Sequence, residues 1–367
     1  MQYVFAVHEA SRTRFKEYEA HLKFHYLPAA EIDVFSKEPS VIRRASAEMH
    51  YMLGIAALLG AKQVLIMQLE PFQLEISRWW VRRSGVQFSG ILFFPFCREF
   101  ESGATWKDSL RREFRGLRKT LQTYWMLQNP NLKTVYFLND PEAVATYNQR
   151  FGSRFRYLPD PIQQVAPPDD SVASVKKRLG VPEDKFVCLI YGHLSPRKNI
   201  PNILKSLAFL PESVRSRMCL LIAGEVEPGY EAVISPALRE AGEAYPELTI
   251  VNMFEFVGPE RTGELFACSD TILIPYLNFY GSSNIIGLAA KYGKPLVGSS
   301  LGLIGKLIGH YRLGVRVAPD KPAAIAEGIL DCLHAGSLDP QNAEAYLKQH
   351  TTEQFSQALL MPERVMA

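Results

Sequence analysis

The chain has 367 residues, of which 47% are hydrophobic and 22% are charged, and its net charge is +3 at pH 7. These values are typical of a globular protein with two domains. The sequence also excludes a membrane-spanning protein, because no apolar run approaches the ~20 residues that cross a bilayer. The start, MQYVFAVHEASRTR, does not match a signal peptide, and the scattered cysteines lack metal-ligand or redox spacing. We therefore expect a cytoplasmic protein in a reducing compartment, without a metal site.

Charge is distributed unevenly along the chain. Residues 1–160 contain 22 Lys and Arg against 16 Asp and Glu, whereas the remainder contains 19 against 22. The two halves therefore carry charges of +6 and −3. We expect an anionic partner or membrane surface to meet the N-terminal half, and the alternative is an uneven scatter of solvated charge.

Strand and helix signals alternate in the N-terminal half, which predicts a parallel sheet with helices on both faces. Strands are expected at residues 3–7, 63–69, 90–95, 134–138 and 155–158. Helices are expected at residues 40–59, 71–83 and 106–127, and after Asp140, which can cap a helix that begins at Pro141.

Residues 159–170, PDPIQQVAPPDD, form the segment most dense in proline and acid, which predicts an inter-domain linker. We accordingly place a first domain at 1–160, a linker with an entry helix at 161–185 and a second domain at 186–335. Residues 336–367 are expected to form helices that can cross back to the first domain. In the second domain, strands are expected at 186–191, 218–223, 248–252, 271–274, 295–298 and 315–317. Helices are expected at 200–209, 230–244, 261–268, 285–292, 303–311, 321–334 and 343–360.

The stretch FYGSSNIIGLAAKYGKPLVGSS, residues 279–300, predicts a small-residue turn between a buried strand and a short helix. Free N–H groups at a helix N-terminus favour an anion, and small side chains allow a phosphate to approach the backbone. The turn consists of Gly281, Ser282, Ser283 and Asn284. An ordinary turn that binds nothing is the alternative.

Two further strand ends favour anions at the same edge of the predicted sheet. The loop YGHLSPRKN presents His193, Arg197 and Lys198 before a helix, and Gly224 and Glu225 follow the strand LLIA. Ligands of a doubly wound sheet bind outside the carboxyl ends of its strands. Cations beside a helix N-terminus suit a diphosphate, whereas a solvated basic loop is the alternative.

These motifs resemble the nucleotide-binding half of GT-B glycosyltransferases, specifically the retaining enzymes of family four. Lys198 falls on the family's diphosphate-binding lysine, and His193 falls where an arginine is expected. The segment FVGPERTGELFACSDTILIPY is similar to the family's base-binding loop, which implies that Val257 and Gly258 contact the base. The resemblance covers about residues 185–335. It implies an α/β fold of two Rossmann-like doubly wound domains that face a cleft.

The chain departs from the family at two further positions, and VFAVHEASRTR lacks the glycine-rich first turn expected after the first strand. Family-four enzymes carry two glutamates across the turn, one for the transferred sugar and one for the ribose, and those positions here are Tyr280 and Leu288. Tyr280 could stack on a sugar, whereas Leu288 is expected to pack in the helix core. Neither side chain accepts hydrogen bonds as a carboxylate does.

The resemblance implies a glycosyltransferase that moves a sugar from a UDP- or GDP-linked donor to a glycan or lipid-linked acceptor, as in polysaccharide biosynthesis. Retention of configuration and independence of metals and cofactors are implied as well, and no nucleic acid is expected as a partner. Lys198, His193 and the N–H groups of the turn would stabilise the leaving diphosphate. The main alternative is an inactive glycosyltransferase-like protein that binds a nucleotide or glycan. A nucleotide-sugar epimerase is a third possibility, without an acid or base to support it.

The helix expected at residues 106–127 is rich in arginine. Arg111, Arg115 and Arg118 share one side of it, which predicts peripheral contact with an anionic acceptor or with the inner face of a membrane. A surface helix with solvated arginines is the alternative. The apolar side chains follow the same period and are expected to pack on the sheet: Leu110, Phe114, Leu117, Leu121 and Trp125.

Overall fold

A computed structural model describes residues 2–94 and 106–360, with only the backbone described for residues 106–115. The chain divides into two compact units that interleave along the sequence. Residues 1–92, 113–136 and 147–155 form the first unit, and residues 93–112, 137–146 and 156–367 form the second. The domain boundaries expected from the sequence stay a prediction. Cys97 lies outside the described residues.

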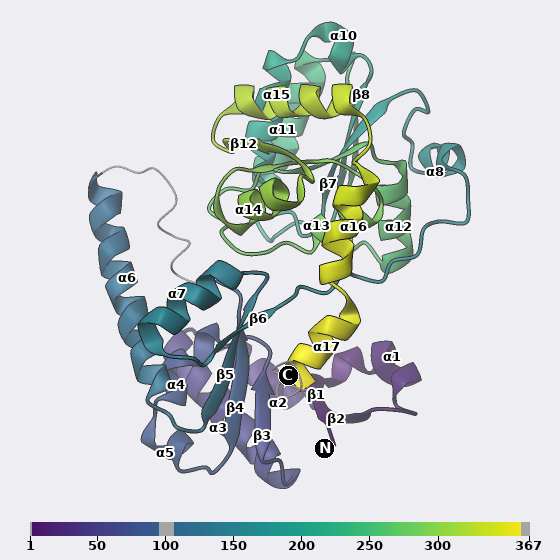
Figure 1. Ribbon diagram of the computed structural model, residues 1–367. Helices are drawn as coiled ribbons and strands as arrows, with labels where there is room; N and C mark the ends of the chain where they lie inside the picture. Colours follow the sequence, from purple (N-terminus) through teal and green to yellow (C-terminus); the bar gives the residue numbers. More distant parts are fainter. Residues whose placement is uncertain (1, 95–105, 361–367) are drawn as a thin grey trace. The chain divides into compact units, whose positions relative to one another are not determined.

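The second unit contains a six-stranded parallel sheet in the order β12-β11-β10-β7-β8-β9 (Figure 1). Its strands are β7 (Phe186–Tyr191), β8 (Met218–Ala223), β9 (Thr249–Met253), β10 (Thr271–Ile274), β11 (Leu296–Ser299) and β12 (Gly314–Val317). The expected strands are therefore confirmed, three of them to the residue. The order runs outward from β7 in both directions, which is the doubly wound arrangement of a dinucleotide-binding sheet.

Helices cover both faces of this sheet because successive strand residues point to opposite sides. Leu189 packs in one buried cluster with α12 and α13, and its neighbour Ile190 packs in another with α9, α11 and α15. The helices of this unit are α8 (Val172–Arg178), α9 (Ile200–Ser206), α10 (Glu212–Arg215), α11 (Glu231–Ala244), α12 (Pro259–Cys268), α13 (Ile285–Lys291), α14 (Gly302–Tyr311) and α15 (Pro322–Ala335), followed by α16 (Pro340–Gln349) and α17 (Thr352–Leu360).

The single helix expected at residues 343–360 is wrong, because α16 ends before His350 and α17 begins at Thr352. Thr351 and Gln354 form a reciprocal capping box: Oγ1 of Thr351 accepts from the N–H of Gln354, and Oε1 of Gln354 accepts from the N–H of Thr351, both at 3.2 Å. Such a box starts a new helix.

In the N-terminal part of the chain, the order of a four-stranded sheet is β3-β4-β5-β6. The strand expected at residues 3–7 does not join it, because β1 pairs in parallel with β2, which the sequence reading missed. The strands are β1 (Val4–His8), β2 (Lys23–Leu27), β3 (Gln63–Ile66), β4 (Gln87–Leu92), β5 (Leu132–Leu138) and β6 (Phe155–Leu158).

The expected helix starts at Ser40 and Asp140 are confirmed, since each side chain accepts a hydrogen bond from the backbone N–H three residues later. The single helix expected at residues 71–83 is wrong. It is divided into short pieces, the first of which ends where Oγ of Ser77 donates to the carbonyl of Leu74 at 2.6 Å. The helices are α1 (Arg12–Phe15), α2 (Ala29–Ser36), α3 (Val41–Leu58), α4 (Gln73–Ile76), α5 (Trp79–Arg82), α6 (Trp106–Leu127) and α7 (Pro141–Phe151).

Helix α6 has the expected bounds, but its expected packing face is wrong. Leu117, Leu121 and Trp125 are 58%, 41% and 49% exposed, whereas Thr123 and Met126 are buried. The helix therefore packs through a line of residues offset from the apolar stripe. The side chains of Leu110, Phe114, Arg111 and Arg115 lie outside the described residues. Among the helices that the structure describes, none is both long and apolar enough to cross a membrane.

Candidate functional site

The strand order places a topological switch point between β7 and β10, which are neighbours in the sheet but whose following connections run to opposite sides. Ligands of doubly wound sheets bind in the crevice at the carboxyl ends of such strands. The loop that begins at Gly192 leaves β7 there, and the turn that begins at Gly281 follows β10. The structure thus brings together at one edge the two segments that the sequence singled out.

Lys198 is the buried cation of this edge, with 2% of its surface exposed. Its Nζ donates to the carbonyl oxygen of Tyr191 at 2.5 Å and to the hydroxyl of Tyr276 at 2.7 Å. Both partners are neutral, so the charge has no carboxylate partner within the described residues. Burial, and to a lesser degree the charge of Arg197, lowers the pKa of Lys198 to about 7. The site therefore holds a cation that an incoming anion would stabilise.

His193 is an exposed residue of the loop that follows β7. Residues beyond β7 continue to pair with the segment after β8, with Leu194 donating to the carbonyl of Glu225 at 2.8 Å. Leu194 is buried, and the isolated bridge that it forms with Val226 does not include His193. The histidine side chain is 52% exposed, and its Nε2 lies 3.8 Å from Oε2 of Glu227.

The small-residue turn is anchored through Ser282 and Ser283. Oγ of Ser282 hydrogen-bonds to both Asp160 and Asn139, so this hydroxyl is already engaged. Ser283 is 8% exposed and caps the first turn of α13 through its carbonyl oxygen. Over residues 2–94 and 106–360, the N–H groups of Ser282, Ser283 and Asn284 donate no hydrogen bond. Because α13 has only seven residues, these free donors matter more to an anion than its helix dipole.

Gly281 and Tyr280 lie at the start of the same turn. A Cβ at Gly281 would lie 3.1 Å from the ring of Phe94, so glycine permits this close packing. Tyr280 is half-buried, and its carbonyl oxygen accepts from the N–H of Leu303 at 3.2 Å.

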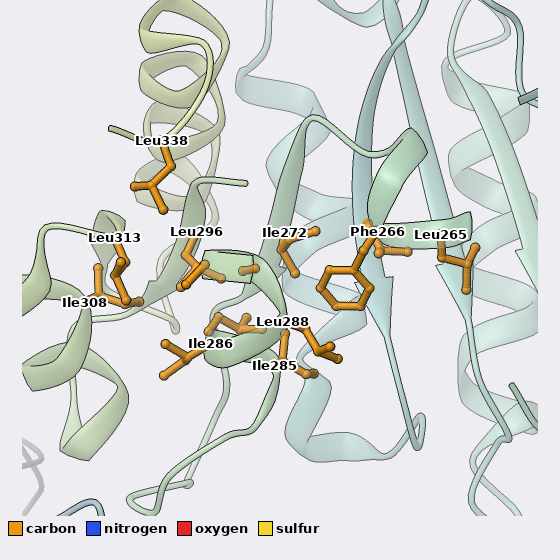
Figure 2. Close-up of a cluster of buried hydrophobic side chains, with 14 of the residues drawn as sticks. Leu265, Phe266, Ile272, Ile285, Ile286, Leu288, Leu296, Ile308, Leu313 and Leu338 are labelled. Carbon is orange, nitrogen blue, oxygen red and sulfur yellow. The ribbon is translucent and has the colours of Figure 1, made fainter. Parts of the chain in front are cut away.

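Leu288 lies on the buried side of α13 and is 0% exposed. Figure 2 shows its side chain among those of Leu265, Phe266, Ile272 and Ile285, in a cluster of buried hydrophobic residues. The expectation that Leu288 packs in the core is therefore confirmed, and the position does not present a side chain to solvent.

Glycine is required at position 224 because two loops touch there. Its φ is +146°, and a Cβ there would lie 2.0 Å from the carbonyl oxygen of Gly192. The two glycines allow the loops after β7 and β8 to touch. Glu225 is exposed and contributes its backbone to the pairing with Leu194.

A hydrogen-bonded chain connects Lys198 with the expected base-binding loop, where Val257 and Gly258 are half-buried. Oγ1 of Thr262 donates to the carbonyl of Gly258 at 2.9 Å, and the hydroxyl of Tyr191 lies 2.7 Å from the same Oγ1. Tyr191 accepts from Lys198 through its own carbonyl. The base-binding role of Val257 and Gly258 stays a prediction, as do the ligand contacts of the other site residues.

Sequence reasoning missed Tyr276, which is 1% exposed and accepts from Lys198. Burial raises the pKa of Tyr276 to about 12, with Arg197 and a hydrogen bond to Ser283 acting in the opposite direction. The signal was available, because Tyr276 directly follows the apolar run TILIP, residues 271–275. In the part of the chain that the structure describes, no three His, Cys, Asp or Glu side chains gather as a metal site would require.

Residues 172–350 match the model of the family described as glycosyl transferases group 1. A D-inositol 3-phosphate glycosyltransferase of Streptomyces griseus is 25% identical over 198 residues, which cover 52% of this chain and 41% of that protein. An uncharacterized glycosyltransferase of Methanocaldococcus jannaschii is 24% identical over 155 residues, covering 42% of this chain and 37% of the relative. The chain thus spans about two fifths of the length of the curated relatives that it matches.

Solved structures are similar over nearly the whole chain. The protein HepE of Anabaena, in complex with UDP and glucose, has a TM-score of 0.66 at 14% identity and covers 99% of this chain and 91% of its own. Sucrose-phosphate synthase of Thermosynechococcus elongatus has a TM-score of 0.67 at 16% identity. The match covers 93% of this chain and 80% of the synthase chain. At these identities the likeness concerns the fold, and it confirms the expected α/β architecture of two Rossmann-like domains.

Proposed function

We propose that this chain, which resembles GT-B glycosyltransferases, transfers a sugar from a nucleotide diphosphate donor to a glycan or lipid-linked acceptor. The observation that carries the proposal is Lys198: a cation that is 2% exposed, without a carboxylate partner among the described residues, at the switch point of a doubly wound sheet. Proteins seldom bury a lysine unless an anion compensates it. A donor diphosphate at this edge would supply that anion.

The reaction breaks the bond between the donor sugar and the diphosphate, on which negative charge develops. Lys198 and the free N–H groups of Ser282, Ser283 and Asn284 would stabilise this charge, because they are fixed before the donor arrives. The proposal assigns this stabilisation to protein groups alone, without a metal ion. Transfer with retention would follow a same-face route in which the leaving phosphate assists the acceptor hydroxyl.

A UDP-linked donor is the first choice and a GDP-linked donor the second. The Anabaena protein HepE, similar in fold, was solved with UDP and with UDP-glucose. In this chain Leu288 is buried, so no side chain at that position is available to the ribose. Tyr280 remains the candidate for sugar contact through stacking or its hydroxyl.

Calorimetric titration with UDP, GDP and their glucose conjugates tests the proposal. Loss of a charge-assisted contact costs about 1.5–3 kcal/mol, so Lys198→Ala should weaken binding by about ten- to a hundred-fold. Lys294→Ala is the matched control, because this partly buried lysine precedes β11 at the opposite edge of the sheet and donates to the carbonyl of Ala267. Equal affinities of parent and Lys198→Ala would refute the proposal, and hydrolysis of the sugar nucleotide would identify the transferred sugar.

The acceptor is proposed to be anionic or membrane-associated, on account of α6. This helix carries six Lys and Arg against two Asp and Glu, and it exposes Leu117, Leu121, Tyr124 and Trp125. A cationic helix with an exposed apolar stripe fits an anionic lipid surface. Arg118 is exposed on this helix, and Arg111 and Arg115 are expected beside it.

The alternative of an inactive binding protein is less favoured. The relatives that match this chain carry the names of enzymes, and Lys198 stands at the position of the family's diphosphate-binding lysine. Turnover of a sugar nucleotide would decide between the two, because a binding protein would bind the donor without consuming it.

A further inference from the structure

Arg197 occupies the position next to Lys198 in the turn Pro196–Lys198, and its guanidinium lies over two buried rings. Its Cζ is 4.7 Å from the centroid of Phe279 and 5.2 Å from that of Tyr276. Nζ of Lys198 lies 4.7 Å from the same Tyr276 centroid. Two cations from one turn therefore converge on one aromatic side chain.

Among the described side chains, none supplies an anion that compensates this pair. In the ranges 2–94 and 106–360, Arg197 has neither a carboxylate nor a side-chain hydrogen-bond partner, and its contacts are the two ring faces. The arrangement differs from that of Arg178, which lies beside Asp170 and Glu264 in the same unit. Adjacent cations repel each other, and the pKa of Lys198 is lowered first by its burial and second by the charge of Arg197.

The ring contacts leave the guanidinium able to bind a phosphate. A guanidinium that stacks on an aromatic face keeps its N–H donors in the plane of the group, where they can form a bidentate contact. Phe279 is two residues before Gly281, and the N–H of Leu277 donates to the carbonyl of Arg197 at 3.1 Å. Arg197 is thereby held between Lys198 and the turn that follows β10.

His193 cannot provide the same charge from where it lies. Its side chain is 52% exposed and its charged neighbour is the carboxylate of Glu227. Charge interactions at so exposed a position contribute little.

We propose that Arg197, rather than His193, is the second cation that binds the donor diphosphate together with Lys198. The inference rests on the proposed function and assigns one residue within it. The cation expected at the position of His193 is then supplied four residues later, from the turn that also carries Lys198. This revises the assignment of His193 made from the sequence.

The test is calorimetry with UDP, uridine and inorganic pyrophosphate on the parent and on Arg197→Gln, Arg197→Lys, His193→Gln and Lys198→Ala. We expect Arg197→Gln to weaken UDP and pyrophosphate by about ten- to a hundred-fold and to leave uridine unchanged, because the lost contact is charge-assisted and addresses the phosphates. Arg197→Lys should recover part of the lost affinity, since lysine restores the positive charge but cannot form the bidentate contact of a guanidinium. His193→Gln should stay within about twofold of the parent.

Three results would overturn the inference alone. The first is a loss in His193→Gln equal to that in Arg197→Gln, and the second is full affinity in Arg197→Gln while Lys198→Ala loses it. Equal weakening of UDP and uridine in Arg197→Gln would also overturn it, because the residue would then be supporting Phe279 and Tyr276. If the parent binds neither UDP nor pyrophosphate, the proposed function fails together with the inference. Melting temperatures of all variants show that each protein is folded.

Discussion

The hydroxyl of Ser282 donates a hydrogen bond to Oδ2 of Asp160 at 3.0 Å, across 122 positions of sequence. The same hydroxyl accepts from Nδ2 of Asn139 at 3.0 Å, and Oδ1 of Asn139 accepts from the N–H of Asp160 at 2.6 Å. The turn proposed to bind the donor is therefore fixed to the segment that the sequence marks as a linker. Burial raises the pKa of Asp160 to about 6, although the bond from Ser282 acts in the opposite direction.

This shift predicts a pH-dependent contribution to stability. The folded state holds the proton of Asp160 more tightly than the unfolded state, so the contribution is fully present below about pH 4 and is lost as the pH rises to about 6. A shift of this size is worth about 3 kcal/mol. Asp160→Asn should therefore gain stability relative to the parent between pH 4 and 6, with no further gain above. Urea unfolding at several pH values measures the difference.

Asp169→Asn provides the matched control, since this carboxylate belongs to the same linker but is exposed. The difference between Asp169→Asn and the parent in the free energy of unfolding should stay constant between pH 4 and 6. If the difference between Asp160→Asn and the parent is also independent of pH, the buried carboxyl does not titrate as described.

The pKa of Lys198 predicts a pH dependence of donor affinity. In the free protein it is lowered to about 7, whereas a bound diphosphate would favour the charged lysine and raise it. The complex then holds the proton more tightly than the free protein, so UDP affinity should fall as the pH rises above 7. Titration from pH 7 to 9 should show about a tenfold loss per unit while the complex keeps the proton. Lys198→Ala should remove this slope, and a slope that persists in the variant would assign it to another group.

The sequence predicted the second sheet well because its strands are continuous apolar runs bounded by Gly, Pro or polar turns. Strands of a buried parallel sheet have this sequence pattern. The expected bounds of β7, β8 and β10 agree with the structure to the residue. The parallel pair β1 and β2 was not anticipated, because Lys23–Leu27 carries His25 and lacks a clear pattern. The exposure of His193 and the contact of Arg197 with Tyr276 depend on how distant segments pack together. Spacing along the chain cannot show such contacts.

Gly224 is predicted to be intolerant of any side chain. Its φ of +146° is unfavourable for other residues, and a Cβ would collide with the carbonyl oxygen of Gly192. We expect Gly224→Ala to lower the free energy of unfolding by more than about 2 kcal/mol. Gly258→Ala is the control, because a Cβ there meets nothing within 4 Å. Chemical denaturation compares the two variants, and equal stability would contradict the close approach of the loops.

Leu288 is predicted to matter for stability and not for nucleotide binding. The side chain is 0% exposed in the cluster of Figure 2, so Leu288→Ala should cost about 2–5 kcal/mol in the free energy of unfolding. Leu288→Met, which keeps the volume, should cost less than about 1.5 kcal/mol. At a temperature where all three proteins are folded, UDP affinity should agree within about twofold. A selective loss of affinity in Leu288→Met would show that the position contacts the ribose.

Helix α6 is predicted to bind anionic membranes through its cations and its exposed apolar stripe. Cations near an anionic surface contribute about 1 kcal/mol each, so combining Arg111→Gln, Arg115→Gln and Arg118→Gln should weaken vesicle binding about a hundred-fold at low salt. Replacing Leu117, Leu121 and Trp125 with alanine tests the stripe separately. This second variant should bind weakly even at low salt, whereas salt should release the parent. Sedimentation with vesicles of neutral and of anionic lipid distinguishes the two contributions. A parent that stays in the supernatant with anionic vesicles would exclude the membrane, and a soluble anionic glycan would then be the acceptor to test.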